Sequence, residues 1–120
     1  MTGNASIAAA FMEAMKNKDL SQAPLASNVY YTGPLSGEPV RGREHVARFL
    51  QVYLPVIREI RLLHQIADGD HVATVWEADT SFGLVSLVYV FRMEGGEIVE
   101  IQAFYDPRGF LERMGMWTGA

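Results

Sequence analysis

The sequence predicts an α+β fold, in which a curved, mostly antiparallel sheet wraps around helices to form a cone with an internal cavity. Two segments of helical period occupy the first half of the chain, and four β-type runs follow one another in the second half. Short turn signals separate these runs, so we expect an antiparallel meander with the helices collected at one end.

Length and composition limit what the chain can be. Its 120 residues, 49% of them hydrophobic, fit a single domain over residues 1–120. The lack of cysteine excludes disulfides and thiolate metal sites, and the net charge of −4 argues against nucleic-acid binding. We see neither a signal peptide nor the roughly 20 apolar residues of a membrane span. We therefore expect a cytoplasmic protein without membrane contact, metal or cofactor.

A first amphipathic helix is expected over residues 5–18. Asn4 can cap its start, because an Asn side chain accepts hydrogen bonds from the free N–H groups of a first turn. Residues 19–28 lack any period and contain Pro24, so we expect a loop there. The apolar positions of the helix recur at helical spacing, at Ile7, Phe11 and Met15.

A short strand and a second helix are expected next. Residues 29–32 are a β-type run that ends at Gly33-Pro34. The second helix covers residues 43–54, and Pro55 ends it because proline cannot continue a helix. Its apolar stripe consists of Val46, Phe49, Leu50, Tyr53 and Leu54.

Four successive strands follow. Asp68-Gly69-Asp70 is a hairpin turn after the first, and residues 72–80 form the second. Residues 85–105 form a hairpin around Gly95-Gly96, since both glycines can take the positive φ of a tight turn. In the first strand, residues 56–66, one face carries Ile60, Leu62, His64 and Ile66.

A last short helix is expected over residues 107–114, with Asp106 as its cap, Pro107 at its first position and Gly115 as its stop. In this order and spacing the chain resembles the nuclear transport factor 2-like superfamily, with its cystatin-like α+β roll, and within it the SnoaL-like small proteins. The resemblance is carried by Tyr31-Thr32-Gly33-Pro34, Gly42-Arg43-Glu44, Asp68-Gly69-Asp70, Gly95-Gly96-Glu97-Ile98 and Phe104-Tyr105-Asp106. The superfamily includes ketosteroid isomerases, polyketide cyclases, limonene epoxide hydrolases, scytalone dehydratases and non-catalytic binders, so the fold alone leaves the activity open.

Asp106 is the first candidate for chemistry. The resemblance implies a working carboxylate near the end of the last strand, as in SnoaL-like cyclases and the epoxide hydrolases. A carboxylate at the edge of an apolar cavity is desolvated, which raises its pKa and suits it to proton transfer near neutral pH. The alternative is a plain helix cap, in which backbone N–H groups bond to the carboxylate and lower its pKa.

Glu77 and Asp79 lie two residues apart, so they share one face of their predicted strand. The matching strand of the epoxide hydrolases resembles Arg-x-Asp, so the resemblance implies that Asp79 is a second catalytic acid and that Glu77 replaces the arginine. Three carboxylates without that cation would repel one another, which argues against epoxide hydrolysis. The side-chain types favour the alternative, in which both face solvent and Thr74, Trp76 and Ala78 face inward.

His64 is a candidate general base, and a packed core or interface histidine is the alternative. Tyr89 is predicted to point into the cone, where its hydroxyl can stabilise a substrate oxyanion. The alternative for the tyrosines is packing with a satisfied hydroxyl. We expect the ligand-binding residues to be Tyr30, Tyr53, Trp76, Glu77, Phe91 and Phe104.

The opposite face of the strand over residues 85–93 carries Ser86, Val88 and Val90. A solvated sheet face would be polar, so these valines indicate a covered surface. Many members of the superfamily dimerise through the outer face of the sheet. We therefore predict a homodimer that uses this face.

Three functions fit the sequence. The first is a cofactor-independent acid–base enzyme, an isomerase, cyclase or dehydratase, which acts on an apolar carbonyl compound with Asp106 as the base. The second is a protein that binds a small apolar molecule in the same cavity without catalysis, and the third is a dimerisation module. The orientation of Asp106 discriminates between them, since a pocket-facing carboxylate supports the enzyme and a capping one supports the binder.

Overall fold

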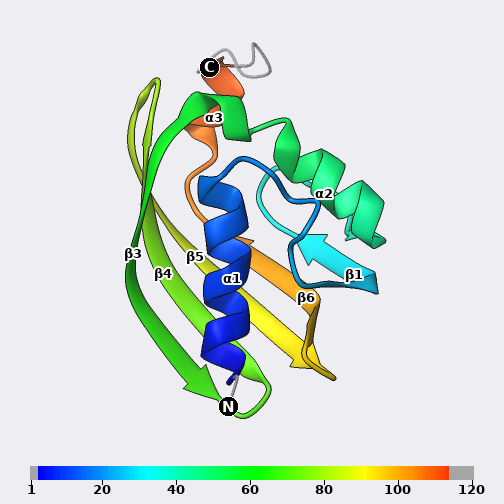
Figure 1. Cartoon of the computed structure of the whole chain (residues 1–120). Coiled ribbons are helices and arrows are strands. Elements are labelled where there is room, and N and C mark those ends of the chain that lie inside the picture. The colour runs from blue at the N-terminus through cyan, green and yellow to red at the C-terminus, as the bar shows by residue number, and fades with distance from the viewer. Residues whose placement is uncertain (1–2, 114–120) are drawn as a thin grey trace.

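The computed structural model describes residues 3–113 of the chain. These residues form one six-stranded sheet with the strand order β2-β1-β6-β5-β4-β3, and the sheet is strongly curved (Figure 1). The predicted α+β class and the curved, mostly antiparallel sheet are confirmed. The strands are β1 (Leu25–Thr32), β2 (Val40–Arg41), β3 (Ile57–Asp68), β4 (His71–Thr80), β5 (Gly83–Glu94) and β6 (Glu97–Phe104).

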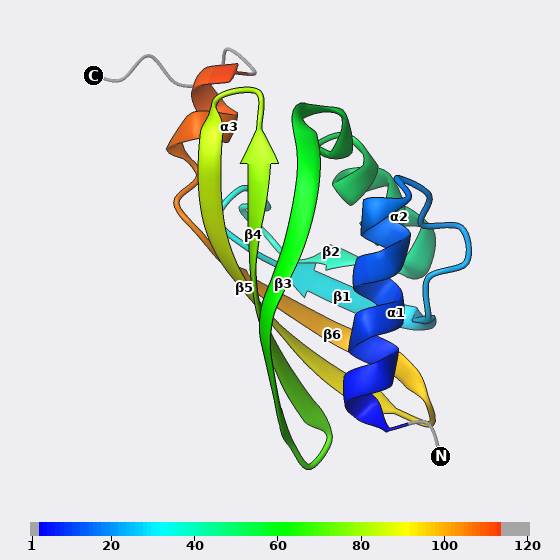
Figure 2. The same ribbon diagram turned by 60° about the vertical axis from the view of Figure 1, so that its left-hand side comes forward.

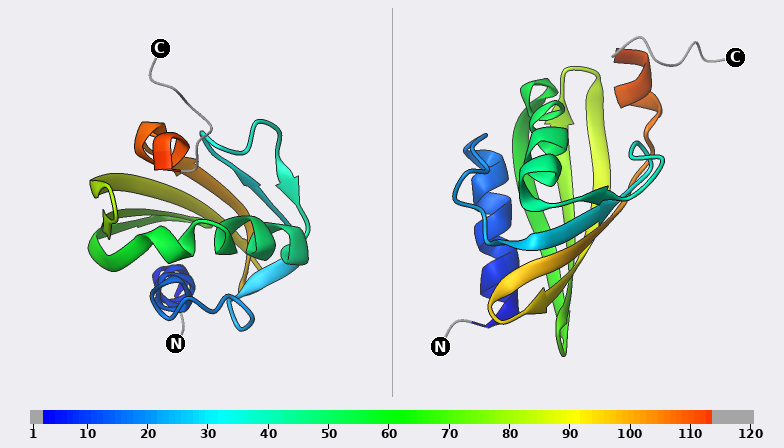
Figure 3. Two further views of the ribbon diagram at one scale, coloured as in Figure 1. Left: turned by 90° about the horizontal axis from the view of Figure 1, so that it is seen from above. Right: turned by 90° about the vertical axis from the view of Figure 1, so that its right-hand side faces the viewer.

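Helices α1 and α2 lie on the same side of the curved sheet, and α3 lies beside the end of the β4–β5 hairpin (Figures 2 and 3). No helix among residues 3–113 is long and apolar enough to cross a bilayer. The helical elements are α1 (Asn4–Lys16), α2 (Arg43–Gln51), the single 3₁₀ turn η1 (Leu54–Val56) and α3 (Arg108–Arg113). The ends predicted for the last helix, Met114 and Gly115, fall outside the described residues.

The start of α1 differs from the prediction. Gly3 is the N-cap, and no side chain caps the helix. The Asn4 amide instead donates to the backbone oxygen of Gly69 at 3.0 Å, which ties the helix start to the β3–β4 turn. The predicted apolar face is confirmed, because Ile7, Phe11 and Met15 are buried.

The strand β1 is longer than predicted. Residues 25–28 were expected to be loop, but Leu25 is paired with Ile98 of β6, with an irregular register up to Tyr30. This pairing is parallel, whereas β3 to β6 form the predicted antiparallel meander. The glycines of the β5–β6 turn have φ values of +57° and +82°, as the hairpin prediction requires.

A bulge in β3 overturns one predicted face. The register shifts between Leu62 and His64, so that Leu62 pairs with Trp76 and His64 pairs with Val75. Paired residues share a face of the sheet, so Leu62 faces inward with Trp76 while His64 faces outward. The prediction that His64 shares the face of Leu62 is therefore wrong. A strict period of two cannot reveal an inserted residue.

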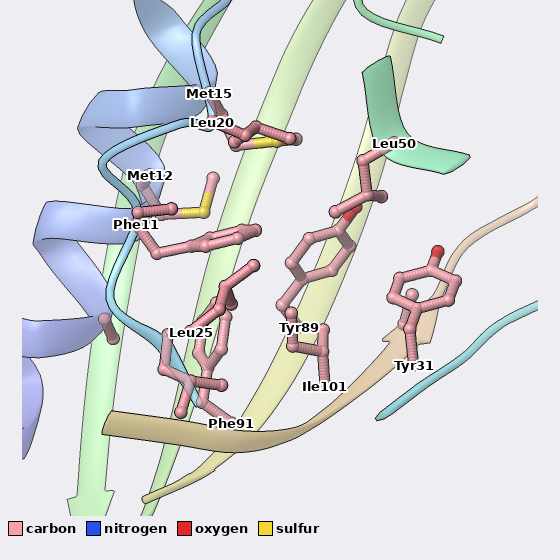
Figure 4. Close-up of a cluster of buried hydrophobic side chains, with 14 of the residues drawn as sticks. Phe11, Met12, Met15, Leu20, Leu25, Tyr31, Leu50, Tyr89, Phe91 and Ile101 are labelled. Carbon is pink, nitrogen blue, oxygen red and sulfur yellow. The ribbon is translucent and has the colours of Figure 1, made fainter. Parts of the chain in front are cut away.

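The core fills the inner side of the sheet beneath α1 (Figure 4). Phe11 from α1 packs edge-on against Phe91 at a centroid distance of 5.4 Å, and Phe91 lies 5.9 Å from the Tyr89 ring. Each aromatic contact adds roughly 0.5–1.5 kcal/mol beyond the area it buries. This packing fixes Tyr89 in one place at the centre of the inner face.

Candidate functional site

A small hollow lies at the end of the core that is nearest to α3. Its volume is about 20 Å³, which holds about one water molecule. Side chains from α1, α2, η1 and α3 and from β1, β3, β4 and β5 line it. The lining residues are Met15, Tyr31, Leu50, Tyr53, Leu54, Ile57, Trp76, Leu87, Tyr89, Tyr105 and Phe110.

Tyrosine hydroxyls supply most of the polar groups of this hollow. Tyr31 and Tyr89 are 1% and 3% exposed, with ring centroids 6.3 Å apart, and Figure 4 shows both hydroxyls directed toward the end of the core where Leu50 lies. Burial raises the pKa of Tyr31, of Tyr89 and of Tyr105, and the hydroxyl of Tyr31 has the other two as hydrogen-bonding neighbours. The three phenols are therefore neutral near neutral pH.

Trp76 brings a second kind of polar group to the hollow. Its side chain is 1% exposed, and its Nε1 atom is the one buried side-chain nitrogen or oxygen among residues 3–113 without a hydrogen-bond partner. The inward orientation predicted for Trp76, Thr74 and Ala78 is confirmed, since all three are buried.

Asp106 lies outside the hollow and is exposed. Its Oδ1 accepts a hydrogen bond from the backbone N–H of Arg108 at 3.0 Å, and its carboxylate also binds the Arg108 guanidinium. These hydrogen bonds lower the pKa of Asp106 to about 2. It borders an open surface groove beside Phe82 and Leu84 instead. Of the two predicted alternatives, this geometry matches the helix cap.

Glu77 and Asp79 also lie outside the hollow, on the outer face of β4. The guanidinium of Arg61 in β3 lies between them, with its Nε 2.8 Å from Glu77 and its Nη1 2.6 Å from Asp79. Hydrogen bonds from Arg61 lower the pKa of Asp79. The solvent-facing alternative therefore matches the structure. Strand β4 has no arginine beside these two acids, in contrast to the Arg-x-Asp strand of the epoxide hydrolases. The neighbouring strand β3 supplies the cation instead, as Arg61.

Three further predicted site residues face away from the hollow. His64 is exposed on the outer face because of the β3 bulge. Phe104 is 54% exposed and pairs with the outward Val88. The guanidinium carbon of Arg41 lies over the ring of Tyr30, 5.3 Å from the ring centroid. The tyrosine of β1 that faces inward is Tyr31. Tyr30, Phe104 and Glu77, which the sequence suggested as ligand-binding residues, are therefore not among the residues that line the hollow.

The structure brings together Tyr53, Trp76 and Tyr89 of the predicted set around the hollow. Phe91 is buried beside Tyr89 but is not part of the lining. Tyr31 and Tyr105 also line the hollow, although they were not among the predicted ligand-binding residues. Strand alternation could have indicated their orientation. Tyr31 lies two residues from Val29, and Tyr105 lies two residues from Ala103, so each is expected on the same face as that buried residue.

Phe110 of α3 closes one side of the hollow. It is 3% exposed, and its ring centroid lies 4.9 Å from Phe82, 5.5 Å from Tyr105 and 6.0 Å from Tyr53. The short helix α3 is therefore held by aromatic contacts to the β4–β5 turn and to the segment before η1. A molecule entering from this side must move Phe110 or Tyr53.

The chemistry of the hollow follows from its lining. Its described side chains are aliphatic, thioether, phenyl, phenolic or indole groups, without a carboxylate, imidazole or amine. Neutral phenols and an indole donate hydrogen bonds but do not take a proton from carbon near neutral pH. No group of three or more His, Asp or Glu side chains within residues 3–113 is arranged to hold a metal ion.

Comparisons with known proteins agree with this architecture. The family model described as "SnoaL-like domain" matches residues 8–101, whereas the search of curated proteins found no match. A steroid delta-isomerase from Pseudomonas aeruginosa superposes with a TM-score of 0.79 at 23% identity, covering 96% of this chain and 91% of that one. A putative ketosteroid isomerase from Kribbella flavida gives 0.78 at 21% identity, covering 86% and 77%. A protein with a cystatin-like fold from Silicibacter pomeroyi gives 0.78 at 23% identity, covering 92% and 82%. At these identities the likeness concerns the fold.

Proposed function

The chain belongs to the family of SnoaL-like domains, and from that premise we propose that it binds a small, neutral, mostly apolar molecule in the hollow beside Tyr31, Trp76 and Tyr89. The observation that carries the proposal is that the lining of the hollow holds apolar groups and hydrogen-bond donors, whereas the candidate acids lie outside it. Aromatic and aliphatic side chains with a few hydrogen-bond donors surround the hollow, while Asp106 and Asp79 lie elsewhere, bound to arginines. A concave apolar site with few polar groups is the usual form of a small-molecule site.

The proposal separates binding from acid–base catalysis by Asp106. Two of the structural neighbours are named as steroid or ketosteroid isomerases, and proton transfer at carbon needs a base within reach of the substrate. In this chain Asp106 is held by Arg108 with its pKa lowered to about 2, which makes it a weak base. The lining of the hollow therefore supports a binder better than an isomerase.

The size of the hollow limits the ligand. About 20 Å³ is too small for more than a water molecule, so a ligand must displace lining side chains on entry. Tyr53 and Phe110 stand at the side closed by α3 and are the natural groups to move. We therefore expect a compact molecule, of the size of one six-membered ring.

A methyl NMR titration with cyclohexanone tests the proposal. We expect saturable shifts at the methyl groups of Met15, Leu54 and Leu87, which line the hollow. The variant Leu87→Phe fills the space and should abolish the shifts at the methyl groups of Met15 and Leu54. The matched control Ser86→Phe adds the same ring to the exposed outer face of β5 and should keep them. Shifts confined to surface residues, or none at all, would contradict the proposal.

We also propose that the protein acts as a homodimer. An apolar outer patch crosses four strands through direct pairings of Ile66 with Ala73, Ala73 with Val90, Val75 with Val88, and Val88 with Phe104. Ile66 and Phe104, at the β3 and β6 ends of this patch, are 62% and 54% exposed, and exposed large apolar side chains on one continuous patch indicate an interaction surface. A second copy of the same patch would cover both.

A further inference from the structure

A surface groove lies between the end of α1 and the start of β3 (Figure 1). Its volume is about 280 Å³, near the lower end of the roughly 300–1,000 Å³ of small-molecule pockets. The apolar side chains that line it are Met15, Ile57 and Ile60, and all three are buried. Met15 and Ile57 also line the hollow, whereas Ile60 lines the groove alone. The groove is therefore a second space beside the hollow, with a residue of its own that can report on it.

Three exposed cations, Lys16, Lys18 and Arg58, line the same groove. Lys16 and Lys18 are the only lysines of the chain. None of the ion pairs within residues 3–113 includes any of the three cations, so each of them is open to a ligand. We call this space the basic groove.

The acids of this region have other partners. Glu59, the one acid among the described lining residues, pairs with Arg61 at 3.2 Å. The carboxylate of Asp19, next to Lys18, accepts a hydrogen bond from the backbone N–H of Ser21 at 3.0 Å. The basic groove therefore has an excess of positive charge, although the chain as a whole has a net charge of −4. A concave surface of one charge concentrates ligands of the opposite charge.

The backbone of Lys18 has a conformation that favours glycine. Its φ of +56° is the one positive φ of a residue other than glycine within residues 3–113. The N–H groups of Lys18 and Asp19 donate to the backbone oxygens of Met15 and Ala14, a helix end at which glycine is the usual residue. Gln51 holds the same place by donating to the backbone oxygen of Lys18 at 3.0 Å. A lysine where glycine would be less strained indicates a role for its side chain.

We propose that the basic groove binds a small anion, a carboxylate or phosphate group on a short apolar body. The charged group lies among Lys16, Lys18 and Arg58, which donate charge-assisted hydrogen bonds to its oxygens. The apolar body lies against Ile60, a contact that a bare inorganic ion would lack. This site is separate from the hollow, and it does not rest on the function proposed for the hollow.

Hexanoate and hexanamide test the proposal, because the two molecules have nearly the same shape and differ in charge. In a methyl NMR titration we expect hexanoate to give saturable shifts at Ile60 and to leave Leu87, which lines only the hollow, unmoved. Hexanamide should bind about tenfold more weakly, since it forms no ion pairs. Added salt should weaken the binding of hexanoate alone, because salt screens exposed charges.

Matched variants assign the charged contacts. Arg58→Gln removes one cation and should weaken hexanoate binding by about threefold, the size of one exposed ion pair. Arg48→Gln makes the same change to an exposed arginine of α2 outside the groove and should bind as the wild type does. Lys18→Gly should weaken hexanoate binding as Arg58→Gln does, yet raise the denaturant midpoint of unfolding, because glycine adopts a positive φ without strain. A purely structural role for Lys18 would not produce these opposite changes.

Hexyl phosphate distinguishes the two kinds of charged group. Tighter binding than that of hexanoate would identify a phosphate and weaker binding a carboxylate, and either result supports the site. Equal affinities for hexanoate and hexanamide would overturn the proposal, as would equal losses in Arg58→Gln and Arg48→Gln. The absence of saturable shifts at Ile60 with both anions would also overturn it. None of these results bears on the cyclohexanone titration of the hollow, so the two proposals can fail separately.

Discussion

The orientation of the Asp106 side chain determines which of two environments its carboxylate occupies. Directed inward it would be a desolvated acid, and directed toward Arg108 it caps the start of α3. The neighbouring Arg108 supplies both a backbone N–H and a guanidinium, so the capping orientation gains a charge-assisted hydrogen bond that the hollow cannot offer.

We predict that NMR titration of the Asp106 carboxyl carbon gives a pKa of about 2, below its ordinary 3.8. Because the folded-state pKa is lowered, the charged carboxylate stabilises the fold at pH values above about 4, and this contribution is lost as the pH falls toward 2. Asp106→Asn identifies the signal and should remove that part of the acid dependence. A pKa clearly above 3.8 would show a desolvated acid and would return Asp106 to the enzyme hypothesis.

The buried tyrosines predict a second pH dependence, on the alkaline side. Burial raises the pKa of Tyr31, Tyr89 and Tyr105 above the ordinary 10.0, so their neutral forms stabilise the fold fully below about pH 10 and this contribution is lost as the pH rises. We expect part of the tyrosinate absorbance to appear only together with loss of the near-ultraviolet circular dichroism. Tyr89→Phe should reduce that late stage. Complete ionisation of all five tyrosines in the folded protein would contradict the burial of the phenols.

At the scale of single residues, the alternation of side chains along a strand predicts which face of the sheet a side chain occupies, but it does not predict the partners of that side chain. Adjacent residues of a strand point to opposite faces, so only one of Tyr30 and Tyr31 can face inward, and the choice of Tyr31 depends on the pairing of β1 with β6. Trp76 was placed correctly, because its strand keeps a strict period of two from Val72 to Thr80. The unpartnered state of Trp76 Nε1 depends on every neighbour in three dimensions, so no sequence pattern could indicate it.

The elements themselves were largely predictable from period and turn chemistry. The two long helices and the meander from β3 to β6 follow the apolar spacing and the glycine turns. The errors come from features that carry no local signal. The bulge after Leu62 reverses the face of the rest of β3, and residues 25–28 form strand only because β6 offers them hydrogen-bonding partners.

The docking of α3 on the β4–β5 turn gives a prediction at the scale of elements. A Cβ added at Gly109 would clash with the ring of Phe82. We therefore expect Gly109→Ala to lower the free energy of unfolding by about 1–3 kcal/mol, although alanine favours a helix. Denaturant unfolding measures the effect.

Phe82→Leu is the matched background for this prediction, since it removes the ring that the new methyl group meets. In that background we expect Gly109→Ala to be neutral or slightly stabilising. Equal destabilisation in both backgrounds would contradict the described contact between α3 and Phe82.

For the whole molecule, the outer patch predicts a dimer. The chain mass is 13.4 kDa, and we expect sedimentation equilibrium at micromolar concentration to give twice this value. Val88→Glu places a charge at the centre of the patch and should yield the monomer. The matched control Val52→Glu changes an exposed valine beyond the end of α2 and should remain dimeric. A wild-type monomer at micromolar concentration would rule out the dimer.

The curved sheet and the helices together decide where a ligand can lie. The chain directs aromatic side chains from β1, β4 and β5 toward one hollow and leaves the carboxylates of Asp79 and Asp106 outside it. A family resemblance predicts this architecture well, because the fold follows from the order of elements. It predicts the site poorly, because the position of an acid depends on single partners such as Arg61 and Arg108.

A crystal structure of the wild-type protein grown with cyclohexanone would show directly whether the hollow is the ligand site. We expect one molecule of the ketone in the hollow, in contact with Tyr89 and Leu87, and Asp106 still bound to Arg108. A ketone bound in the surface groove beside Asp106, with the hollow empty or holding only water, would contradict it.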